Sequence, residues 1–145
     1  MNTPIQTLYL FLQSEGLFGD WTAPDGSIQP APTVQMRLFD EKDVPTNERI
    51  LLIRNSSSGG GTRYVSTPSF LFSIMGKAGE SAVFAETYAE LIYSALLDFE
   101  NEDCIISIDP MGRIGGAYKT ESGRAVYDME FSVNVDSGHF GAGKT

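Results

Sequence analysis

An alternation of apolar and polar residues near the end of the chain is the feature that most restricts its fold. Tyr127, Met129, Phe131, Val133 and Val135 alternate with Asp128, Glu130, Ser132 and Asn134. Successive side chains of a strand point to opposite faces of its sheet, so the pattern predicts a strand with one buried face and one wet face. A sheet of such strands needs a covering layer on one side.

A long helix is predicted to supply that layer. Between residues 80 and 100, apolar residues recur at helical spacing and acidic residues take the other side. The apolar set is Phe84, Tyr88, Leu91, Ile92, Ala95, Leu96 and Phe99, and the acidic set is Glu86, Glu90 and Asp98. We expect an amphipathic helix packed on a sheet.

A second helix is predicted at the N-terminus. Thr3 can cap it, Pro4 takes the first helical position, Gln6 completes a capping box, and Gly16 is a plausible stop. The stretch LYLFL, Leu8 to Leu12, would be apolar on every side of a helix. The helix is therefore either central in the domain or covered by a neighbouring subunit, and both readings stay open.

Further strands are expected at ILLIR (50–54), in RYVSTPSFLFSIMGK (63–77), and at CIISIDP (104–110), which a DPMG turn follows. A hairpin is expected around TESG (120–123), and a short strand at 34–40. Residues 18–34 and NSSSGGGT (55–62) are predicted as loops, the second either a flexible loop or a hairpin tip. The predicted fold class is α+β, with a mixed or antiparallel sheet of about four to six strands. Residues 1–136 would form one domain, and residues 137–145 a flexible tail.

The composition excludes several classes of protein. The 145 residues include 10 basic and 19 acidic side chains, for a formal charge of −9, which disfavours gripping a nucleic-acid backbone. The single cysteine, Cys104, allows no intrachain disulfide. The sequence has no apolar run long enough for a membrane helix, and its N-terminus lacks a basic region like that of a signal peptide. We expect a soluble, intracellular protein that does not bind membranes.

The final residues, GHFGAGKT (138–145), fit the phosphate-binding loop pattern G-x-x-x-x-G-K-[ST]. Such a loop normally joins a strand to a helix whose N-terminal dipole favours the phosphates. Here Thr145 is the last residue, no later aspartate can hold magnesium, and the expected sheet is built from hairpins. We therefore interpret the match as a glycine-rich tail, with a small nucleotide- or ligand-binding protein as the alternative.

Other catalytic arrangements are weak in this sequence. His139, the single histidine, lies in the predicted tail, and Cys104 opens an apolar strand where a buried thiol is expected. Trp21 and Tyr64 could stack a ligand, although loop aromatics more often pack locally. We expect no enzyme activity and no catalytic, metal or cofactor site.

The order of elements resembles the tail terminator (tail completion) proteins of long-tailed bacteriophages, and related minor capsid or tail-completion families. Three stretches carry the resemblance: ILLIRNSSSGGG, PSFLFSIMGKAGESAVFAETYAELIYSALL and ESGRAVYDMEFSVNV. It covers roughly residues 50–135, with the N-terminal helix added by position. Residues 18–34 and 137–145 have no counterpart in it.

The resemblance implies a structural virion protein that assembles into a ring, usually a hexamer. Such a ring caps the tail tube, ends its polymerisation and joins the tail to the head, and DNA passes through without specific binding. Its partners would be further copies of the chain, the tail tube protein and a head–tail connector protein. It would be found in the host cytoplasm during assembly and then at the head–tail junction. Another connector or tail component is the alternative.

Candidate partner contacts follow from these expectations. They include apolar residues of the N-terminal helix, the glycine–serine loop with its flanking arginines, and cations of the C-terminal hairpin. The candidates are Leu8, Leu10, Phe11, Arg54, Ser57, Ser58, Gly59, Gly60, Arg63, Arg113, Lys119 and Arg124. The loop would order on docking to the tube or be an ordinary hairpin tip, and an acidic channel would let DNA slide.

Overall fold

The computed structural model describes residues 3–23, 25–36, 48–61, 65–100, 105–113, 118–121 and 123–136. The described elements are, in chain order, α1 (Pro4–Ser14), β1 (Trp21–Thr22), β2 (Ile28–Gln29), β3 (Thr33–Met36), β4 (Ile50–Gly61), β5 (Val65–Met75), α2 (Val83–Leu97), β6 (Ile105–Arg113), β7 (Tyr118–Lys119) and β8 (Ala125–Asp136).

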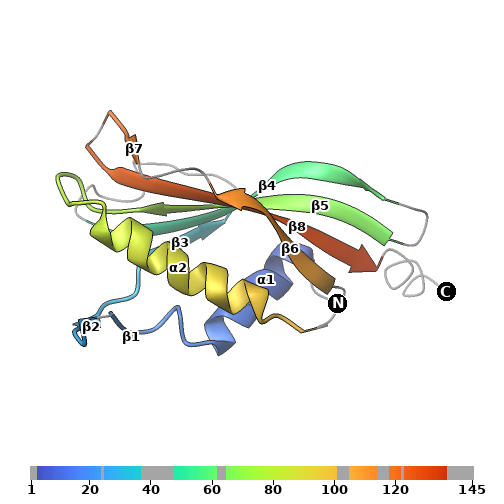
Figure 1. The fold of residues 1–145 in the computed structure, drawn as a ribbon, viewed down its shortest axis with the longest axis horizontal. Helices are drawn as coiled ribbons and strands as arrows, with labels where there is room; N and C mark the ends of the chain where they lie inside the picture. The colour runs from blue at the N-terminus through green and yellow to red at the C-terminus, as the bar shows by residue number, and fades with distance from the viewer. Residues whose placement is uncertain are drawn as a thin grey trace.

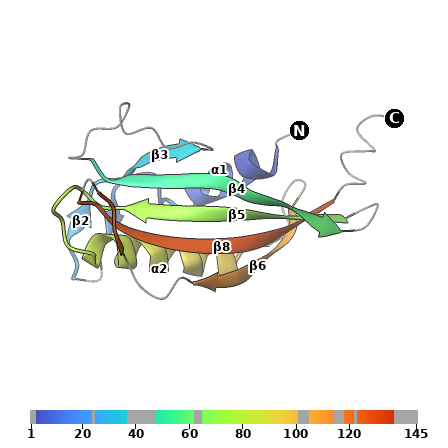
Figure 2. The ribbon, with the colours of Figure 1, turned by 90° about the horizontal axis from the view of Figure 1, so that it is seen from above.

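Six of these strands form one mixed sheet, with the order β3-β4-β5-β8-β6 (Figure 2) and with β7 also paired to β8. The pair β3 and β4 is parallel, and the other pairs are antiparallel. The α+β class and the mixed sheet are therefore confirmed. The predicted hairpin at TESG is confirmed too, since the Thr120 N–H donates to the Arg124 carbonyl at 2.9 Å across the turn.

Both helices lie on the same face of the sheet (Figure 1). Phe84, Tyr88 and Ile92 of α2 pack into one core with Phe72 and Phe131 of the sheet. Helices α1 and α2 thus share the covering layer, which was predicted to come from one long helix. The first and last residues of α2, Val83 and Leu97, belong to neither the apolar nor the acidic set of the prediction, and both are exposed.

Helix α1 begins at the predicted capping box. Thr3 Oγ1 accepts from the Gln6 N–H at 3.3 Å, and the Thr3 N–H donates to Gln6 Oε1 at 2.9 Å. Gly16, with φ +81°, follows the end of the helix in the left-handed region. Leu8 is fully buried within the chain, whereas Leu10 remains 46% exposed. The central position of α1 therefore accounts for most of its apolar surface.

The flexible-loop alternative for 55–62 is wrong for the described residues 55–61, which continue strand β4 to the far end of its antiparallel pairing with β5, in keeping with the hairpin alternative. The pairing of β4 with β5 extends to Gly61↔Ser66, with irregular register between Asn55 and Ser57 and again between Ser57 and Gly60. Backbone pairing with β5 maintains the strand, and the bulges absorb the extra residues. The far ends of β4, β5 and β8 run past the helices (Figure 1).

Two other segments, predicted as a turn and as a loop, also contain strand residues. The expected DPMG turn lies inside β6, where the register shifts between Pro110 and Gly112. A bulge on an outer strand tolerates the missing N–H of proline. The predicted loop at 18–34 contains the small antiparallel pair β1 and β2, closed by a turn in which Gly26 has φ +88°.

The alternation in β8 holds from Met129 to Val135 but fails near the start of the strand. Asp128, expected on the wet face, is buried and accepts a 2.8 Å hydrogen bond from the Tyr118 hydroxyl. Tyr127, expected in the core, is only partly buried. The short β7 arm, which carries Tyr118, therefore shields a polar position that the pattern assigned to water.

Candidate functional site

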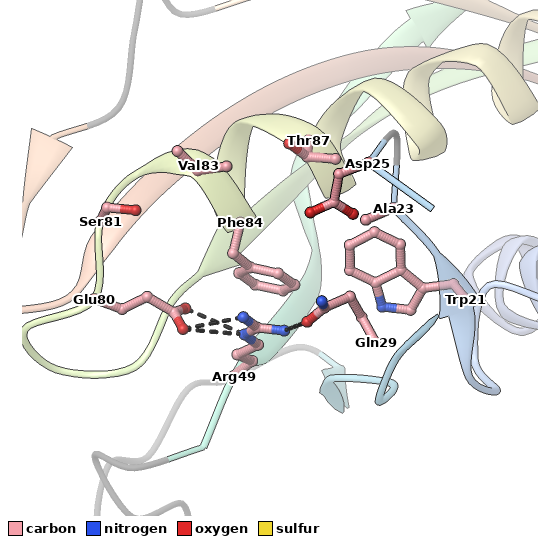
Figure 3. A pocket seen from close by; sticks show the side chains of 10 residues that line it. All are labelled: Trp21, Ala23, Asp25, Gln29, Arg49, Glu80, Ser81, Val83, Phe84 and Thr87. Carbon is pink, nitrogen blue, oxygen red and sulfur yellow. Dashed lines mark hydrogen bonds and ion pairs between the residues drawn. The ribbon is translucent and has the colours of Figure 1, made fainter. Parts of the chain in front are cut away.

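A pocket of about 210 Å³ lies where the β1–β2 hairpin meets the N-terminal end of α2 (Figure 3). Trp21 and Phe84, both largely buried, form its apolar part, and their ring centroids lie 6.1 Å apart. Val83 and Thr87 of α2 line another side. The pocket thus combines two largely buried aromatic rings with a mostly polar lining that includes Asp25, Gln29, Arg49 and Glu80.

Arg49 forms a fixed wall of this pocket. Its Nη2 lies 3.0 Å from Glu80 Oε2, its Nε lies 3.1 Å from Glu80 Oε1, and its Nη1 donates to Gln29 Oε1 at 3.0 Å (Figure 3). The guanidinium carbon also lies 4.2 Å from the centroid of the Phe84 ring. Because Glu80 neutralises the guanidinium, Arg49 is a structural link and not a free anion-binding group.

The segments around Arg49 explain how this pair forms. Arg49 immediately precedes β4, and Glu80 lies in the turn between β5 and α2. Gly76 leaves room for the carboxylate, because a Cβ at that position would stand 2.9 Å from Glu80 Oε1. The pair therefore ties the start of the central sheet to the entry of α2.

Hydrogen bonds from Ser27 fix the carboxylate of Asp25 at the rim of the pocket. Asp25 Oδ1 accepts from the Ser27 hydroxyl at 2.6 Å and from the Ser27 N–H at 2.9 Å. These hydrogen bonds, the side-chain bond first, lower the pKa of Asp25 and keep it charged. Among the described residues, no group of three or more His, Cys, Asp or Glu side chains could hold a metal ion.

Arg124, a predicted contact residue, is buried inside the chain with 0% exposure. Its Nη1 donates to the Glu48 carbonyl at 2.7 Å and to the Gly76 carbonyl at 2.9 Å. The guanidinium therefore braces the segments before β4 and after β5, and its side chain is not available to a partner in this structure. The sequence placed Arg124 in a predicted hairpin and gave no indication that its guanidinium is buried and braces two segments.

The structure separates the other predicted contact residues. Leu8 and Phe11 are buried in the core, while Leu10, Arg54 and Lys119 are exposed. Ser57, Ser58, Gly59 and Gly60 form the backbone of β4, and Arg113 is the last residue of β6. Arg63, Tyr64, Cys104, His139 and the GAGKT stretch lie outside the described residues.

The described contact candidates lie on several different elements, and sequence reasoning missed the pocket. Trp21 was considered alone, whereas the structure places it beside Phe84 and Tyr88 of α2. Arg49 and Glu80 belong to no sequence motif, because their pairing depends on the antiparallel return of β5 beside β4.

Within the described part of the chain, no helix is long and apolar enough to cross a membrane.

Comparisons with known proteins agree with this architecture. A family model described as "Phage tail termination protein" matches residues 5–137. A solved structure titled "Virion of native gene transfer agent (GTA) particle" contains a chain with a similar fold, at a TM-score of 0.56 and 14% identity. The match covers 90% of this chain and 92% of that chain, and at this identity it shows the fold alone. No curated protein matches the sequence.

Proposed function

This chain belongs to the phage tail termination protein family, and we propose that it forms a ring that caps the tail tube. The ring ends polymerisation of the tube and joins the finished tail to the head. The observation that carries this proposal is the family match, which spans nearly the whole described domain from α1 to β8. The chain acts by binding its neighbours, and no reaction is needed for this role.

The proposed assembly is a homo-oligomer, with a hexamer as the expected size. Closed rings arise when one surface patch of a subunit binds a different patch of the next copy. Exposed apolar residues are available on several elements of the isolated chain, among them Leu10, Val83, Leu97 and Met111. Burial of such side chains between subunits would supply the association energy.

The extended ends of β4, β5 and β8 are the proposed contact with the tail tube protein. They run past the helices, and their β4 segment, residues 55–61, presents a backbone rich in serine and glycine (Figure 1). Small residues let another backbone approach closely. Deletion of Ser57 to Gly60 is therefore expected to impair joining to the tube, and normal joining would refute this contact.

The ring is proposed to carry DNA through its centre without binding it specifically. The formal charge of −9 supports this role, because carboxylates facing a channel repel phosphates. A head–tail connector protein would contact the opposite face of the ring. The chain would then be present in the host cytoplasm during assembly and in the virion afterwards.

Electron microscopy of tails made without this chain tests the proposal. Loss of a terminator leaves tubes of uncontrolled length that do not join heads, and addition of the purified chain restores both properties. Tails of normal length, joined to heads in its absence, would contradict the assignment.

A further inference from the structure

We draw no further inference here: the strongest candidate, the buried carboxylate of Asp128 beside the short β7 arm, has one oxygen held by the Tyr118 hydroxyl and the other enclosed without a hydrogen-bond partner, and nothing in the described part of the chain shows which group would reach that second oxygen.

Discussion

Arg49 and Glu80 are 31 positions apart in the sequence and form a two-pronged ion pair, with Nη2 3.0 Å from Oε2 and Nε 3.1 Å from Oε1. We predict that Arg49→Lys lowers the free energy of unfolding by about 1–2 kcal/mol, because a lysine offers one point charge and cannot also reach Gln29. The side chains keep 16% and 20% exposure, so solvent screening limits the loss. Urea unfolding measures it, with exposed Lys77→Arg as the control. Equal stability of Arg49→Lys and the wild type would show that the pair is not a structural link.

Replacement of Arg124 by methionine is predicted to cost about 2–4 kcal/mol of stability. The change leaves the Glu48 and Gly76 carbonyls without the donor that they share in the core. Arg54→Met, at an exposed site, should change stability by less than about 0.5 kcal/mol. Thermal or urea denaturation of both variants checks the contrast. A loss in Arg54→Met as large as that in Arg124→Met would contradict the bracing role of Arg124.

Stability should fall steeply in alkaline solution because of Tyr88. Burial raises its pKa far above the ordinary value of 10.0, and its hydroxyl donates to the Leu17 carbonyl at 2.6 Å. Above pH 10 the unfolded chain releases this proton and the folded chain retains it, so unfolding is favoured as the pH rises. The slope from one such group is at most about 1.4 kcal/mol per pH unit.

Tyr88→Phe should be less stable at neutral pH, because it lacks the hydrogen bond, but its stability should decline less above pH 10. Tyr118 contributes to the remaining slope, since burial and the hydrogen bond to Asp128 raise its pKa as well. Urea unfolding at several pH values measures the two slopes. Identical slopes for Tyr88→Phe and the wild type would refute the assignment.

The cap of α1 gives a further prediction. Thr3→Ala removes the acceptor for the Gln6 N–H and should destabilise the chain by about 1 kcal/mol. Thr3→Ser retains the hydroxyl and should keep most of the stability. The pair of variants separates capping from lost packing, and equal stability of Thr3→Ala and Thr3→Ser would contradict a capping role.

Local patterns made much of this fold predictable. The capping box at Thr3, the β5 face formed by Phe70, Phe72 and Ile74, and the TESG hairpin all depend on neighbouring residues, and the structure contains each of them. For the glycine–serine stretch, the flexible-loop alternative failed because pairing with the neighbouring strand, not side-chain propensity, holds residues 55–61 in β4.

Patterns of neighbouring residues could not predict the pocket. Its walls come from β2, from the residue before β4 and from the turn before α2, and only the folded topology brings Gln29, Arg49 and Glu80 together. The buried position of Arg124 was hidden for the same reason, since its acceptors lie 76 and 48 positions away. The composition indicated an acidic protein but could not show that the side chain of Arg124 is buried.

Imaging of tail tubes with and without the purified full chain tests the central claim most directly. Tube protein alone should polymerise to broad, increasing lengths. Addition of the chain should stop growth and leave a six-fold ring with an open centre on the tube end. Continued elongation with no added density at the tube ends would contradict the proposal that this protein terminates the tail.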